Sequence, residues 1–83
     1  ELVKSGLLIN VATHRYYLPS QLKDVAKIVQ RMAASEPLTV RGFRDETGMG
    51  RNVAIDVLEY FDSKGFTRRH GNDRIILNAN IFD

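Results

Sequence analysis

A group of basic side chains in this sequence has the type and spacing that phosphate binding requires. A guanidinium presents a planar fork of donors that can bind a phosphate in bidentate fashion, and the free backbone N–H groups at a helix start attract the same anion. Arg51 follows Gly48-Met49-Gly50, where a helix is expected to begin, so both features meet there. The other basic residues of this group lie before Arg51 or on a basic hairpin after it. The group consists of Arg41, Arg44, Arg51, Arg68, Arg69, His70 and Arg74.

Residue types that serve metal binding or catalysis form no comparable pattern. His14 and His70 stand alone, without cysteine and without a His-x-x-x-His spacing, so no metal site is expected. Gly48-x-Gly50 lacks the Lys-Ser/Thr pair that completes a phosphate loop, and no Ser/His/Asp grouping can be argued. We therefore expect a non-catalytic binding module with no cofactor of its own.

Two helices and a sharp turn are expected to position Arg44 and Arg51. Thr39 is a good N-cap for a short helix over residues 40–47, and Gly48-Met49-Gly50 supplies two residues that tolerate positive φ. A second helix then ends at Gly65, which suits the C′ position. Its buried stripe recurs with a helical period and consists of Ala54, Val57, Leu58 and Phe61.

A hairpin and an earlier helix complete the expected fold. Residues 66–69 and 74–77 are strand-like, and residues 70–73 between them are turn formers. In the segment before Arg41, Ser20 is expected to cap a helix that stops near Ser35. Three helices followed by a β-hairpin wing predict an α+β, mainly α, winged helix-turn-helix fold, which is used mostly to bind nucleic acid.

Composition limits the class of protein without deciding it. The 83 residues suggest one small domain, with room for a recognition module and hardly for an enzyme cleft. The net charge is only +2, because ten carboxylates offset twelve Lys and Arg residues, so the distribution of charge matters more than its sum. The absence of cysteine fits a reducing cytoplasm, and no apolar run is long enough to span a membrane.

The beginning of the chain resembles its end at a fixed offset. Gly6 aligns with Gly65, Arg15 aligns with Arg74, and a hairpin of equal length accompanies each pair. This repeat suggests tandem winged-helix modules. We therefore expect residues 1–18 to be the helix end and wing of a preceding module, residues 19–83 to be a complete C-terminal module, and the chain to be a fragment of a longer protein. The first hairpin should either pack on the complete module or be mobile.

The charge pattern of the second helix favours RNA over duplex DNA as the ligand. A helical wheel places four polar residues opposite the buried stripe, namely Asn52, Asp56, Glu59 and Ser63. Two carboxylates on this face would oppose phosphates if it lay in a DNA major groove. A footprint made of a helix start and a wing suits the bunched phosphates and splayed bases of an RNA hairpin loop.

Several segments resemble the last winged-helix domain of the bacterial selenocysteine-specific elongation factor family, SelB. They are Phe43-Arg44-Asp45, Gly50-Arg51, residues 58–62 and Gly65-Phe66-Thr67-Arg68-Arg69-x-Gly71-Asn72-Asp73, while residues 2–8 resemble the end of the preceding winged helix. The resemblance implies a non-catalytic module that anchors the factor to the SECIS hairpin of selenoprotein mRNA for recoding of UGA. It also implies a parent GTPase that uses GTP and Mg²⁺ and that meets selenocysteinyl-tRNA and the ribosome in the cytoplasm.

The same resemblance implies which residues contact RNA. The family's grip falls on the helix start and the wing, at Gly50, Arg51, Asn52, Asp56, Arg68, Arg69, His70, Gly71 and Asn72. Position 52 commonly carries a basic residue in the family and position 56 a neutral polar one, so Asn52 and Asp56 depart from the pattern and should reduce phosphate attraction.

Two alternatives share this fold. A DNA-binding transcription regulator would prefer duplex DNA to hairpin RNA, and the acidic helix face counts against it. A winged helix used only for protein contact would show no salt-sensitive nucleic-acid binding, and the near-neutral net charge is compatible with it.

Overall fold

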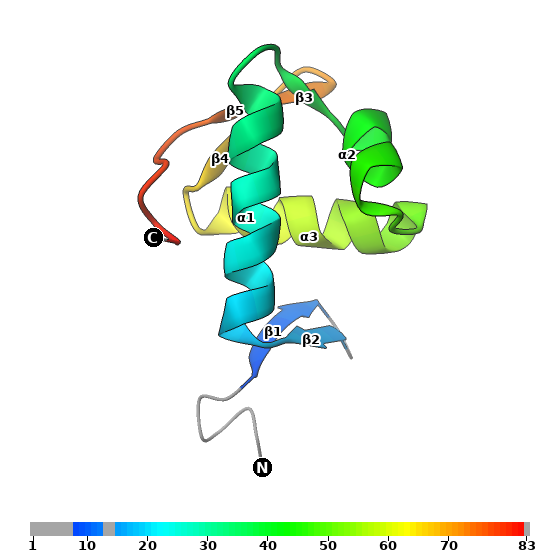
Figure 1. The fold of residues 1–83 in the computed structure, drawn as a ribbon, viewed down its shortest axis with the longest axis vertical. Helices are drawn as coiled ribbons and strands as arrows, with labels where there is room; N and C mark the ends of the chain where they lie inside the picture. The colour runs from blue at the N-terminus through cyan, green and yellow to red at the C-terminus, as the bar shows by residue number, and fades with distance from the viewer. Residues whose placement is uncertain (1–7, 13–14, 83) are drawn as a thin grey trace.

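A computed structural model describes residues 8–12 and 15–82 (Figure 1). The expected helix end in residues 1–5 lies outside the described residues. In chain order the elements are β1 (Ile9–Ala12), β2 (Arg15–Tyr17), α1 (Pro19–Ala33), β3 (Leu38–Thr39), α2 (Val40–Thr47), α3 (Arg51–Ser63), β4 (Thr67–His70) and β5 (Asp73–Ile76). This order of helices and strands is a winged helix, as the sequence predicts.

The start of α1 differs from the expectation in its capping residue. Pro19 occupies the first helical position, where its fixed φ and missing N–H are no disadvantage, so Leu18 becomes the N-cap. The Leu18 N–H donates to Oε1 of Gln21 at 2.8 Å, which satisfies the backbone group that precedes the helix. The prediction that Ser20 caps this helix is therefore wrong, because Ser20 lies inside the first turn.

The turn that joins α2 to α3 follows the sequence signals closely. Thr39 Oγ1 accepts a hydrogen bond from the Gly42 N–H at 3.0 Å and caps α2. Gly48 ends α2 with a φ of 74°, and Gly65 follows α3 with a φ of 78°, both in the left-handed region. Gly50 instead has a φ of −67° and serves as the N-cap of α3.

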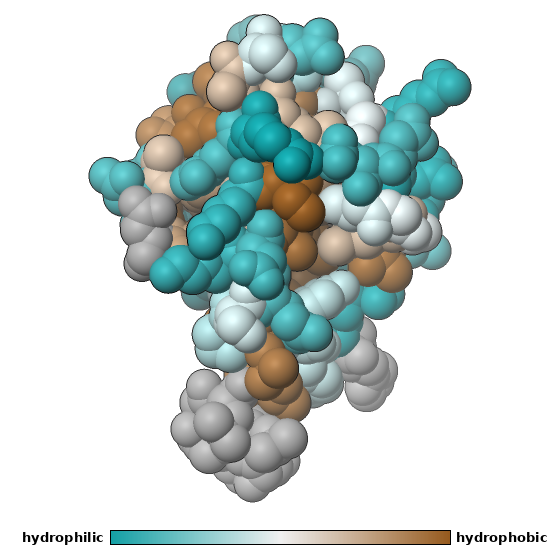
Figure 2. Space-filling model, in the orientation of Figure 1, coloured by the Kyte–Doolittle hydropathy of each residue, from teal (hydrophilic) through white to brown (hydrophobic). Residues whose placement is uncertain are grey.

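The hydrophobic core lies where α1, α2 and α3 meet the sheet. All four residues of the predicted stripe on α3 are fully buried, and Phe61 packs edge-on against Phe66 with ring centroids 5.1 Å apart. Complete burial of each such ring contributes about 2–3 kcal/mol. The face of the molecule that carries α1 is mostly hydrophilic, and its hydrophobic areas are small (Figure 2). None of the helices in the described segments is long and apolar enough to cross a bilayer.

The wing belongs to a three-stranded antiparallel sheet with the order β3-β5-β4. His70 pairs with Asp73, so the turn between β4 and β5 consists of Gly71 and Asn72 alone and not of the four residues expected. Gly71 has a φ of 64°, as a tight hairpin turn requires. Strand β3 was not expected, because its two residues offer no alternation to detect.

The hairpin of β1 and β2 lies against α3 near the start of α1 (Figure 1). Ile9, Val11 and Tyr17 pack against the core in a half-buried state. For its described residues, the hairpin is therefore packed on the rest of the fold, which is the first of the two alternatives that the sequence left open.

Candidate nucleic-acid interface

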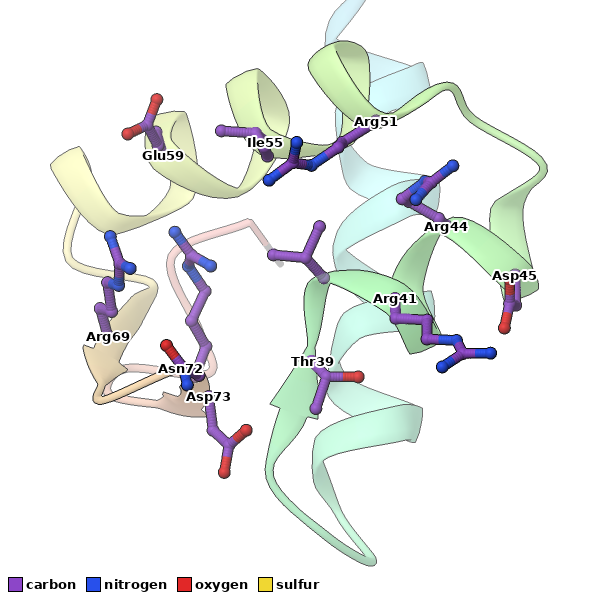
Figure 3. Close-up of a pocket in the computed structure, with 12 residues that line it drawn as sticks. Thr39, Arg41, Arg44, Asp45, Arg51, Ile55, Glu59, Arg69, Asn72 and Asp73 are labelled. Carbon is purple, nitrogen blue, oxygen red and sulfur yellow. The ribbon is translucent and has the colours of Figure 1, made fainter.

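A cleft of about 520 Å³ separates the start of α3 from the wing. Its polar wall residues come from β3, α2, α3, β4, β5 and the wing turn (Figure 3). The lining consists of Thr39, Val40, Arg41, Arg44, Asp45, Arg51, Ile55, Glu59, Arg69, Asn72, Asp73 and Arg74. Five arginines from separate parts of the sequence therefore share one concave surface.

One stripe of α3 forms the first wall of the cleft. Arg51, Ile55 and Glu59 follow each other at a spacing of four residues, which aligns them along one side of a helix. Arg51 extends from the start of the helix over the cleft, and Ile55 adds a half-buried apolar surface beside it (Figure 3). The helical wheel placed Glu59 and Asp56 on one outward face, but the structure separates them, because only Glu59 lines the cleft.

The first turn of α3 is open to an anion. Gly50 offers no side chain to cap the N-terminal N–H groups, and the first turn holds no acidic residue. The helix is 13 residues long, so its dipole adds positive potential at this end. Arg51 stands at the same point, and the backbone and the side chain can bind one phosphate together.

Helix α2 forms the neighbouring wall with Arg41, Arg44 and Asp45. Arg44 is half-buried, and its Nε atom is buried without a hydrogen-bond partner among the described residues. A buried N–H without an acceptor is costly. Asp45 and Arg41 are exposed at the rim.

Strand β4 sends its two arginines to opposite faces. Arg69 lines the cleft and extends toward α3 (Figure 3), whereas the exposed Arg68 lies on the other face of the strand and does not line it. The Arg69 Nε donates to the carbonyl oxygen of Gly71 at 3.1 Å, which holds the side chain against the wing turn. His70 is exposed and also lies outside the cleft lining.

Arg74 does not occupy the exposed position that its charge suggested. Only 4% of the residue is exposed, and its Nε donates to Oδ2 of Asp62 at 3.0 Å and to Oδ1 at 3.3 Å. Thr67 Oγ1 donates to the same Oδ1 at 2.6 Å. One edge of the buried guanidinium thus joins α3 to the wing, while the residue also contributes to the cleft lining.

Asp56 faces the first hairpin and not the cleft. Its Oδ2 accepts from Nε of Arg15 on β2 at 3.1 Å, and each side chain is about one-third exposed. Asp56, one of the two residues expected to reduce phosphate attraction, therefore has a cation of its own, so its charge is offset within the chain. Sequence reasoning treated Arg15 only as a repeat of Arg74 and missed this pairing, which joins residues 41 positions apart.

The cleft thus gathers part of the predicted site. Of the predicted residues it contains Arg44, Arg51, Arg69, Asn72 and Arg74, with Gly50 and Gly71 adjoining it, and it leaves out Asn52, Asp56, Arg68 and His70. The predicted RNA contacts did not include Thr39, which the sequence identified as a helix cap, or Ile55, Glu59 and Asp73, all of which line the cleft. The lining also carries the carboxylates of Asp45, Glu59 and Asp73. Such a mixed lining suits a ligand with both phosphates and base amino groups better than a bare anion.

Two further features lie outside the cleft. Tyr60 packs against Phe82 and Phe61, and partial burial raises the pKa of its phenol above the ordinary 10.0. Lys64 Nζ lies 5.6 Å from the centre of the Tyr60 ring.

No group of three or more His, Cys, Asp or Glu residues with a metal-binding arrangement occurs in the part of the chain that the structure describes.

Comparison with known proteins shows the family. Residues 30–76 match the model described as elongation factor SelB, winged helix. The chain is 35% identical to the selenocysteine-specific elongation factors of Haemophilus influenzae, over 96% of this chain and 13% of the relative, and of Escherichia coli, over 99% and 14%. It therefore spans about one-seventh of the length of these relatives. A solved structure of the mRNA-binding domain of E. coli SelB in complex with SECIS RNA is similar with a TM-score of 0.80 and 33% identity, over 92% of this chain and 64% of that one. The chain belongs to the SelB family of selenocysteine-specific elongation factors.

Proposed function

We propose that the cleft binds a folded RNA hairpin, the SECIS element of a selenoprotein mRNA. The observation that carries this proposal is the meeting of Arg51, at the uncapped start of α3, with Arg69 on the wing across one concave surface. In the proposed complex these two side chains bind phosphates on separate segments of the hairpin. Asn72 and Glu59, which also line the cleft, bind base edges between them.

The similar E. coli domain was solved with SECIS RNA, which supports the choice of ligand. In the wider proposal this chain is the mRNA anchor of a cytoplasmic factor. A separate GTPase portion of that factor uses GTP and Mg²⁺ and carries selenocysteinyl-tRNA to the ribosome, where UGA is recoded. The module itself performs no chemistry. In the same proposal, residues 1–18 derive from a preceding winged helix, and residues 19–83 belong to the RNA-binding module.

The geometry weighs against the alternative of reading duplex DNA. A recognition helix that enters a major groove needs its exposed side free along several turns. The β1–β2 hairpin contacts α3, and Arg15 is paired with Asp56 in the middle of that helix. The remaining free surface lies at the helix start and along the cleft, which suits a compact ligand.

A competition experiment tests the proposal. Labelled SECIS hairpin RNA is bound to the protein and displaced by unlabelled hairpin RNA, duplex DNA or unstructured RNA, each at two salt concentrations. The proposal expects the hairpin to compete best and binding to weaken as salt rises. Preferential displacement by duplex DNA would favour the transcription-regulator alternative, and the absence of any salt-sensitive binding would favour a protein-contact module.

A further inference from the structure

The two walls of the cleft are joined by a small network of side-chain hydrogen bonds. Asp62, in the last turn of α3, accepts hydrogen bonds from Thr67 on β4 and from Arg74 on β5. We propose that Asp62 is a positioning residue for RNA binding, because it fixes the wing relative to α3 and thereby sets the placement of Arg69 opposite Arg51. This inference rests on the proposed function.

The chain connection between the two walls is short. Arg51 belongs to α3 and Arg69 to the wing, and the chain between these elements passes through Gly65, whose φ is 78°. A short connection through such a residue leaves the angle between helix and hairpin to be fixed by other contacts. The Asp62 carboxylate supplies two such contacts, one to Thr67 at the start of β4 and one to Arg74 on β5, and both of these residues are buried.

Asp62 also balances the charge of Arg74 on the wing. Arg69 and Arg74 are directly opposite each other in the β4–β5 ladder, and like charges in that relation are unfavourable. Asp62 offsets the charge of Arg74 through an ion pair with 3.0 Å between Nε and Oδ2. Without this carboxylate the buried guanidinium would lack a counter-charge, and Arg69 could reduce the repulsion only by moving. Asp62 thus acts on RNA binding through Arg69.

The proposal makes a prediction whose sign is opposite to that of simple electrostatics. Removal of a carboxylate near an RNA site normally tightens binding, because it reduces repulsion of phosphates. We expect Asp62→Asn to weaken binding of the SECIS hairpin by about three- to tenfold instead. Asp24→Asn is the matched control, because Asp24 is exposed on α1, lies outside the cleft lining and makes no ion pair in the described part of the chain. It should leave affinity unchanged.

A double-mutant cycle separates positioning from general loss of stability. All variants are compared by anisotropy titration at a temperature where circular dichroism shows them folded. If Asp62 acts through Arg69, Arg69→Ala should cost much less affinity in the Asp62→Asn background than in the wild type. Additive losses would overturn the proposal, and so would wild-type or tighter binding by folded Asp62→Asn. If that variant does not fold, Thr67→Val removes only one hydrogen bond of the network, and the same cycle with Arg69→Ala decides.

A measurement without RNA distinguishes failure of this inference from failure of the proposed function. Residual dipolar couplings of backbone amides report the orientation of β4 and β5 relative to α3. We expect Asp62→Asn to change this orientation and Asp24→Asn, on the exposed surface of α1, to leave it unchanged. An unchanged orientation in Asp62→Asn would overturn the positioning role even if the wild-type protein bound no RNA, whereas lack of wild-type binding alone would reject only the function.

Discussion

Replacement of Arg74 by methionine should destabilise the fold, although the residue looks like a surface cation in the sequence. The Arg74 side chain is 5% exposed and that of Asp62 is 25% exposed, with 3.0 Å between Nε and Oδ2. Loss of one partner from a buried ion pair costs about 3–5 kcal/mol. Because Asp62 keeps its bond to Thr67 and some contact with water, we expect a smaller loss of about 2–3 kcal/mol.

This loss is large relative to the stability that such a chain can have. A domain of 83 residues has a free energy of unfolding of about 4–12 kcal/mol. Urea denaturation followed by circular dichroism should therefore show a midpoint about 2 M lower for Arg74→Met, since the denaturant slope of a small domain is about 1 kcal/mol per M. The difference should persist in high salt, because a buried pair is screened much less than a surface pair.

Arg68→Met is the matched control for this experiment. Arg68 lies on β4, the strand that pairs with β5, and its side chain is exposed on the opposite face from Arg74. The same substitution there should change stability by no more than about 0.5 kcal/mol. Equal losses for the two variants, or a loss below about 0.5 kcal/mol for Arg74→Met, would refute the assignment of Arg74 to a structural ion pair.

Two further predictions concern the start and the end of α3. Gly50→Asp adds a side chain that can cap the helix, and its Cβ would meet no atom within 4 Å beyond the adjoining residues, so stability in urea should rise by about 0.5–1 kcal/mol. The new carboxylate occupies the proposed phosphate site, so a hairpin titration should show binding about tenfold weaker or worse, whereas tighter binding would contradict the site. Burial raises the pKa of Tyr60, so the unfolded phenol ionises at its ordinary 10.0 while the folded one stays protonated, and stability should fall as pH rises above 10. Tyr60→Phe should remove that part of the fall above pH 10, and identical profiles would contradict it.

Local signals in the sequence predicted the helical part of the fold well. Thr39 and Gly65 act through their own backbone neighbourhoods, so the cap of α2 and the end of α3 follow from residue type and position. The buried stripe of α3 follows from its period. Ser20 was assigned wrongly as a cap, because the preference of Pro19 for the first helical position moves the helix start toward the N-terminus.

Long-range pairings explain why part of the site could not be predicted. The sequence analysis placed Arg74 among the cations of a binding surface, but the residue is only 4% exposed, whereas its neighbour Ile75 is 41% exposed. The acceptor that makes burial of Arg74 possible is Asp62 on a different element, and nothing near position 74 indicates it. The partner of Asp56 is likewise a residue of the first hairpin, so its orientation depends on how that hairpin packs.

The central claim is that the start of α3 and the wing bind one folded RNA from opposite sides of the cleft. The most direct test measures the affinity for the SECIS hairpin as a function of salt for Arg51→Ala, Arg69→Ala, the double variant and Arg68→Ala. Each of the first two should flatten the slope of log affinity against log salt by about 0.7–0.9, and the double variant by about twice as much, since each side chain neutralises one phosphate. Arg68→Ala, which changes a cation outside the cleft, should leave the slope close to that of the wild type. Unchanged slopes for Arg51→Ala and Arg69→Ala would contradict the claim.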